Sequence, residues 1–75
     1  MNLSEILRRT MDETQTPARV CAAALGLSPQ NFGQRLKRGT LSLEQICTAI
    51  EACGAIMVVQ VTQGGKLLYN GTSVE

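Results

Sequence analysis

The sequence predicts a mainly helical domain of four short helices with a C-terminal β-hairpin. Apolar residues recur at helical spacing as far as Ile50, and serine or threonine before proline, together with glycines, divides this stretch into helix-length segments. After Gly54, two apolar runs, the first rich in β-branched residues, flank Gly64-Gly65. Because 75 residues hold one hydrophobic core, we expect a single domain over 1–75, with a helical core at 2–54, a hairpin at 55–70 and a tail at 71–75.

The first helix is expected to start near the N-terminus and to stop before the polar run 12–16, which predicts a connection. Asn2 and Glu5 have the spacing of a capping box, and Ser4 is a competing cap. One apolar stripe runs along this helix and consists of Leu3, Ile6, Leu7 and Met11.

A short second helix is predicted from Pro17 to Leu25. Thr16 is its expected N-cap, proline suits the first helical position, and Gly26 suits a left-handed C-cap. The small Ala22 lets a neighbouring helix approach closely. The other residues expected to pack are Val20, Cys21, Ala24 and Leu25.

The third helix is predicted over about residues 29–37 and is almost entirely polar. Ser28 and Pro29 repeat the start signal of a cap followed by proline, and Gly39 closes the helix. Only Phe32 and Leu36, four residues apart, can anchor it to a core.

The fourth helix is predicted to begin at Ser42, which forms a possible capping box with Gln45. Gly54 is its natural terminator. Its inward-facing residues are expected to be Leu43, Ile46, Cys47 and Ile50.

The hairpin is predicted to pair residues 56–61 with 66–69 through Gly64-Gly65, because a type I′ turn needs positive φ at both positions. Both faces of its first strand are apolar, whereas a two-stranded ribbon beside four small helices buries only one. We therefore expect a homodimer joined through this segment; the alternative is a hairpin folded wholly onto its own core. The expected interface residues are Ile56, Val58, Gln60 and Leu68.

The second and third helices have the form of a helix-turn-helix, since two short helices are joined by a glycine-containing turn. The outward face of the third helix suits the major groove of DNA, because glutamine and asparagine bond bidentately to adenine and arginine to guanine. Although the net charge is only +1, residues 14–43 contain four basic and no acidic residues. Such a cluster of basic residues is typical of a surface that contacts the phosphates of DNA.

The candidate DNA-binding residues fall into two groups. The expected base-reading residues are Gln30, Asn31, Gln34 and Arg35. The expected contacts to the DNA backbone are Thr16, Arg19, Ser28, Lys37, Arg38 and Thr40. Arg8 and Arg9 are either plain surface charges or further phosphate contacts. Gly33 is either tolerated in its helix, at about 1 kcal/mol relative to alanine, or lets the helix backbone approach DNA closely.

Two stretches carry a family resemblance. The first, residues 22–32 (AAALGLSPQNF), resembles the helix-turn-helix of the Cro and lambda-repressor family of phage and bacterial regulators. The second, residues 36–46 (LKRGTLSLEQI), resembles the later part of the same domain. The resemblance covers about residues 2–54. It implies a lambda-repressor-like fold and a repressor that binds a pseudo-palindromic operator as a dimer, with base-reading glutamines at Gln30 and Gln34.

Two positions depart from the family pattern. Pro29 stands where many relatives have a base-reading glutamine or arginine, so that contact is lost. The third helix is one residue longer before Gly39, so Arg35 is either a base reader or a phosphate clamp.

Other classes of protein are disfavoured. Histidine is absent and no paired carboxylates are placed for acid–base work, so we expect no enzyme. No cofactor and no metal are expected, and no small-molecule ligand, because nothing in the 75 residues provides a ligand-sensing domain. The three cysteines, an odd number without CxxC spacing, are expected to be small buried hydrophobes in a reducing cytoplasm; a thiolate metal or redox site is the alternative. No apolar run approaches the ~18 residues of a membrane span.

The alternative function is a protein-interaction module or antitoxin-like partner that uses the hairpin.

Overall fold

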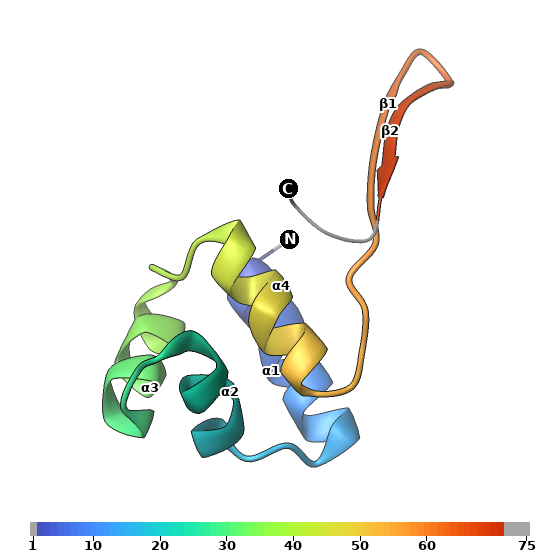
Figure 1. Ribbon diagram of the computed structural model, residues 1–75. Coiled ribbons are helices and arrows are strands. Elements are labelled where there is room, and N and C mark those ends of the chain that lie inside the picture. The colour runs from blue at the N-terminus through green and yellow to red at the C-terminus, as the bar shows by residue number, and fades with distance from the viewer. Residues whose placement is uncertain (1, 72–75) are drawn as a thin grey trace.

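The computed structural model describes residues 2–71, which form four helices followed by a two-stranded antiparallel sheet (Figure 1). The elements are α1 (Leu3–Thr14), α2 (Ala18–Leu25), α3 (Pro29–Arg38), α4 (Leu43–Ala52), β1 (Val59–Gln63) and β2 (Lys66–Gly71). The predicted mainly helical class with a C-terminal hairpin is confirmed. Gly71, placed in the tail by the sequence analysis, belongs to β2, and the rest of that tail lies outside the described residues. Among the described residues, no helix is long and apolar enough to cross a membrane.

Helix α1 extends to Thr14, and so includes the first three residues of the polar run 12–16 that was predicted to be a connection. Its polar residues lie on the solvent side, and the hydroxyl groups of Thr10 and Thr14 donate to the carbonyl oxygens of Ile6 and Thr10 at 2.9 and 2.7 Å. The helix ends at Gln15, whose φ of 52° is left-handed. The predicted end of the helix is too early because polar side chains do not end a helix where its last turn faces solvent.

The N-terminal cap of α1 is Asn2, as expected, but its bond differs from that of a capping box. Its Oδ1 atom accepts from the backbone N–H of Ser4 at 2.9 Å, instead of from that of Glu5. Ser4 is therefore not a cap; it is buried in the first turn of the helix.

Thr16-Pro17 and Ser28-Pro29 were both predicted to begin a helix with a hydroxyl cap, but only the serine is a cap. Ser28 caps α3 by accepting from the backbone N–H of Asn31 at 3.1 Å, with Pro29 as the first helical residue. Thr16 does not cap α2, because Pro17 has an extended ψ of 154° and is itself the N-cap residue. The Thr16 hydroxyl lies one residue too early and instead bonds the Thr14 hydroxyl at 2.7 Å.

Ser28→Ala is expected to lower the free energy of unfolding by about 1 kcal/mol, because it leaves an N-terminal N–H of α3 without its acceptor. Thr16→Ala is the matched control and should change the free energy of unfolding by less than about 0.5 kcal/mol, as at other surface positions. Chemical denaturation of the two variants measures both values. Equal losses would show that the two hydroxyl groups have the same role.

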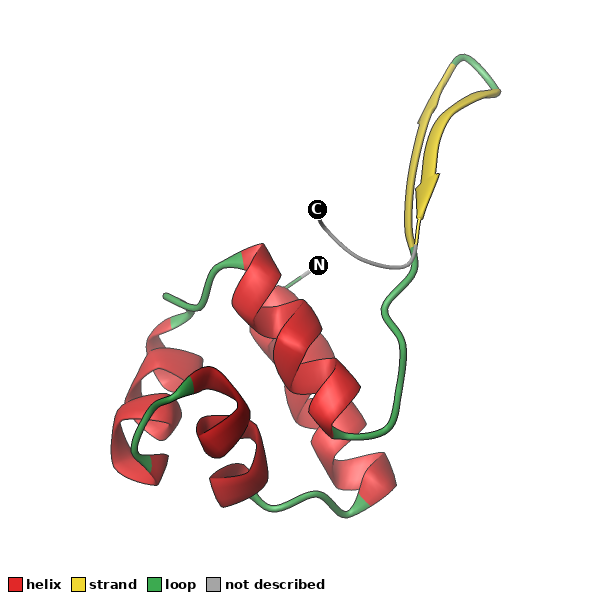
Figure 2. Cartoon of the chain, in the orientation of Figure 1, coloured by secondary structure: helices red, strands yellow, loops and turns green. Residues whose placement is uncertain are grey.

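Helix α4 packs across α1 and α2 and completes the core (Figure 2). Its predicted capping box is confirmed: Ser42 and Gln45 exchange side-chain to backbone bonds at 2.9 and 3.1 Å. The helix ends at Ala52, just before the predicted terminator Gly54, and Cys53 is its C-cap. The core cluster consists of Leu7, Cys21, Ala22, Phe32, Leu36, Leu41, Ile46, Ala49 and Ile50.

Three residues that were expected to pack inward do so less than predicted. Val20 and Ala24 are exposed on α2, and Leu43 is only half-buried. The core-facing stripe of α2 consists of Cys21 and Ala22, with the half-buried Ala18 and Leu25 packed beside them, and Val20 and Ala24 lie off this stripe.

The hairpin turn has the predicted geometry, with φ of 55° and 84° at Gly64 and Gly65. The first strand begins at Val59 and not at residue 56 as predicted, and Val59 pairs with Gly71 in the outermost pair of the described ladder. Val61 pairs with Tyr69 and Thr62 with Leu67, so Leu68 is the extra residue of a β-bulge.

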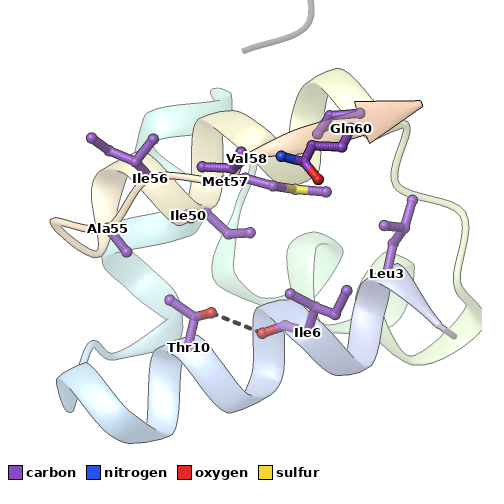
Figure 3. A pocket seen from close by; sticks show the side chains of 10 residues that line it. Leu3, Ile6, Thr10, Ile50, Ala55, Ile56, Met57, Val58 and Gln60 are labelled. Carbon is purple, nitrogen blue, oxygen red and sulfur yellow. Dashed lines mark hydrogen bonds between the residues drawn. The ribbon is translucent and has the colours of Figure 1, made fainter. Parts of the chain in front are cut away.

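The hairpin stands apart from the helices, to which residues 53–58 connect it (Figure 1). In the connection the half-buried Ala55 and Met57 pack on the core, while Ile56 and Val58 are 68% and 59% exposed. A groove of about 460 Å³ lies between α1, α4, this connection and the start of β1. Leu3, Ile6 and Ile50 line it opposite Met57 and Val58 (Figure 3).

Candidate nucleic-acid interface

Helices α2 and α3 are joined by a tight turn that depends on Gly26. This glycine has a φ of 69°, and the backbone N–H groups of Gly26 and Leu27 donate to the carbonyls of Ala23 and Ala22 at 3.1 and 2.9 Å. The turn thus ends α2 with a left-handed residue, for which glycine is the favoured choice. Ala22 is fully buried at this end of the helix pair.

Helix α3 is attached to the core on one side only. Its two buried side chains are Phe32 and Leu36, one helical turn apart. The remaining positions of the helix face solvent or are half-buried, as the sequence analysis predicted. The exposed candidates on this helix are Gln30, Asn31, Gln34, Lys37 and Arg38, and Arg35 is half-buried.

Two of the candidate base readers bond each other. The Nε atom of Arg35 donates to Oδ1 of Asn31 at 3.1 Å, one helical turn away. A bidentate contact from Asn31 to adenine uses that same oxygen, whose second lone pair can accept from the adenine amino group while Arg35 stays bonded. Arg35 uses only one of its five donors in this bond, and the others suit a guanine edge or a phosphate.

The candidate backbone contacts lie around this helix. Arg19 is exposed at the start of α2, and Lys37 and Arg38 are exposed in the last turn of α3. The hydroxyl of Ser28 accepts the N–H of Asn31 and retains its own proton to donate. Thr40 follows α3, and its hydroxyl lies 3.5 Å from the carbonyl oxygen of Arg35, a long and weak bond.

Thr16 is the candidate with the weakest support. It is half-buried before α2 and its hydroxyl is engaged with that of Thr14. Thr16 directly precedes Pro17, the N-cap residue of α2, and its side chain caps no N–H group of that helix.

The structure gives Arg8 a role that the sequence analysis did not include. Its Nη2 atom donates to the carbonyl oxygen of Leu36 at 3.3 Å, close to the C-terminus of α3. A cation there satisfies one of the last helix carbonyls and opposes the negative end of the helix dipole. Arg8 therefore ties α1 to α3. The two residues are 28 positions apart, and no local signal predicts their contact. Arg9 is exposed on α1.

Gly33 lies on the solvent side of α3, between Gln30 and Gln34. A Cβ atom built at this position meets no other atom of the described chain within 4 Å. Packing inside the protein therefore does not require a glycine here.

The described residues contain no group of three or more cysteine or carboxylate side chains placed to hold a metal ion. Comparisons with protein-family models, with curated proteins and with solved structures found no match.

Proposed function

We propose that this protein is a sequence-specific regulator of transcription, a Cro-like repressor with a lambda-repressor-like fold that binds a pseudo-palindromic operator in double-stranded DNA as a homodimer. One observation carries the proposal. Helix α3 follows a tight glycine turn, buries only Phe32 and Leu36, and presents a continuous polar and basic face to solvent. A helix of this kind fits the major groove of B-DNA.

In this proposal the residues of α3 divide by the chemistry of their side chains. Gln30, Gln34 and Asn31 read base edges, with Arg35 either reading a base or clamping a phosphate. Arg19, Lys37 and Arg38 hold the DNA backbone, assisted by the hydroxyls of Ser28 and Thr40. Occlusion of a promoter by the bound dimer is sufficient for repression.

The proposed dimer is joined through the hairpin. Its apolar side chains are exposed on a ribbon that stands away from the core, and an isolated two-stranded ribbon is only marginally stable in water. Both strands also have an unpaired edge that a second copy can extend. The proposed interface residues Ile56, Val58, Gln60 and Leu68 are all exposed in the single chain.

The proposal is tested by selecting binding sites from a random duplex pool with the purified protein, while light scattering gives its mass. The expected result is a dimer that enriches a pseudo-palindrome with half-sites about 34 Å apart. Gln34→Ala and Arg35→Ala should reduce that enrichment while leaving the fold unchanged. A folded dimer that binds no duplex at low salt would overturn the proposal.

That last outcome would favour the second candidate function, a protein-interaction module or antitoxin-like partner. The observation in its favour is the same exposed hairpin, in which Val61, Leu67 and Leu68 are each about half exposed. In that case the hairpin, and not α3, is the functional surface.

Leu68→Asp is expected to convert the dimer to a monomer. The side chain is 51% exposed in the single chain, so the change costs little there, whereas a buried interface would have to desolvate an unpaired carboxylate. Val20→Asp, at an exposed apolar residue of α2, is the control and should remain dimeric. Light scattering at equal concentrations measures the mass; a dimeric Leu68→Asp variant would place the interface elsewhere.

Gly33→Ala is expected to stabilise the protein and to weaken its binding to DNA. Alanine in an exposed helix interior gains about 0.5–1 kcal/mol over glycine, and nothing in the chain obstructs the added methyl group. The same methyl group would separate the α3 backbone from a closely approaching duplex. Thr48→Ala, on the exposed side of α4, is the control for affinity. Unchanged affinity in Gly33→Ala would mean that this glycine is merely tolerated.

A further inference from the structure

Two cysteines that are far apart in the sequence lie next to each other where α2 packs against the end of α4. The Sγ atoms of Cys21 in α2 and of Cys53, the C-cap of α4, are 3.7 Å apart. The residues are separated by 32 positions, and they lack the short spacing by which thiol pairs are usually found in a sequence. Neither forms a disulfide.

The two thiols differ in their access to solvent. Cys21 is fully buried, and its Sγ also lies 3.7 Å from the carbonyl oxygen of Ala49. Burial, followed by the hydrogen bond with Cys53, raises the pKa of the Cys21 thiol to about 11. Cys53 is only half-buried at the end of its helix. A soluble oxidant therefore reaches the Cys53 thiol before the Cys21 thiol, which is buried next to it.

The third cysteine is not part of this pair. The Sγ atom of Cys47 is buried on another side of α4 and donates to the Sδ atom of Met57 at 3.7 Å. Cys47 thus provides an internal control, since it is a cysteine of the same helix region with a different sulfur neighbour.

We propose that Cys21 and Cys53 form an oxidation site at which a hydroperoxide produces an intramolecular disulfide. The Cys53 thiol loses its proton, and its thiolate attacks the peroxide; the O–O bond breaks, a sulfenic acid forms, and the hydroxide that leaves takes up a proton to become water. The Cys21 thiol then loses its proton, and its thiolate attacks the Cys53 sulfur; the S–O bond breaks, and the hydroxide that leaves becomes the second water molecule. Two thiols and one hydrogen peroxide thus give one disulfide and two water molecules.

The disulfide would link α2 directly to the end of α4. The loop that it closes contains α3 and the tight turn before it, so the cross-link restricts the unfolded chain and stabilises the helical core. Cytosolic disulfides are typically transient and redox-sensing, and thiols restore the reduced state. This inference does not depend on the proposed DNA binding.

The test treats the folded protein with about one equivalent of hydrogen peroxide and maps its cysteines without reduction. Trypsin together with a glutamate-specific protease separates the three cysteines onto peptides 20–35, 45–51 and 52–66. The expected product joins peptide 20–35 to peptide 52–66 within one chain, with the loss of two hydrogens. It should form in the wild type and in Cys47→Ala, and it should be absent from Cys53→Ser.

Thermal unfolding provides a second readout. A single disulfide that closes a loop of this size should raise the Tm of the oxidised wild type by at least about 5 °C, and dithiothreitol should reverse the shift. Cys53→Ser should show no such reversible increase. Sulfinic acid at Cys53 with a free Cys21, or a disulfide between two chains, would overturn the proposal.

Discussion

The affinity of this protein for duplex DNA is expected to fall by about 10³–10⁵-fold between about 50 and 200 mM salt. The basic residues proposed to contact phosphates are Arg19, Lys37 and Arg38, with Arg35 as a possible fourth, and a dimer doubles each contact. Each neutralised phosphate releases condensed counterions, so the logarithm of the binding constant falls linearly with the logarithm of the salt concentration. Fluorescence anisotropy with a labelled duplex at several salt concentrations measures this slope.

The same measurement on variants identifies which cations contribute. Lys37→Gln and Arg38→Gln should each reduce the slope by about 1 for every phosphate contact that is lost, and the loss should be similar for all duplex sequences. Lys66→Gln is the matched control, because Lys66 is an exposed cation beside the hairpin turn, outside α2 and α3. A slope that depends on Lys66 and not on Lys37 or Arg38 would assign the basic surface to the hairpin and contradict the proposed site.

Phe32→Ala is expected to lower the free energy of unfolding by about 3–5 kcal/mol, a large part of the stability of a domain of this size. Phe32 is fully buried, and it is the largest of the fully buried side chains. It is also one of the two buried side chains of α3, so its loss both opens a cavity and weakens the attachment of the proposed recognition helix. Chemical denaturation at a fixed protein concentration measures the change.

Val20→Ala is the control for this prediction. Val20 belongs to the neighbouring helix α2 but is 38% exposed, so its truncation should change the free energy of unfolding by less than about 0.5 kcal/mol. A loss in Phe32→Ala no larger than that in Val20→Ala would mean that α3 is not held by this side chain.

The candidate site could be predicted in part because its signals are local. The capping of α3 by Ser28 and the left-handed turn at Gly26 each depend on residues at most a few positions apart. The exposed face of α3 follows from the helical period once Phe32 and Leu36 are recognised as the only apolar anchors. The prediction that Thr16 caps α2 was wrong, because a hydroxyl residue before proline does not fix where the helix starts. Pro17 has an extended backbone and is itself the N-cap, so α2 starts at Ala18 and not at Pro17.

By itself, the sequence determined the number and order of the elements in the described chain, the capping of α3 and α4, and the turn at Gly64-Gly65. These features depend on φ preferences and hydrogen bonds within a few residues, which are the same in any tertiary context. Only the tertiary structure decided which distant groups meet: Arg8 with the end of α3, Cys21 with Cys53, and a hairpin that leaves its apolar side chains exposed. Such contacts depend on how whole helices pack against one another, and that packing is a property of the assembled core.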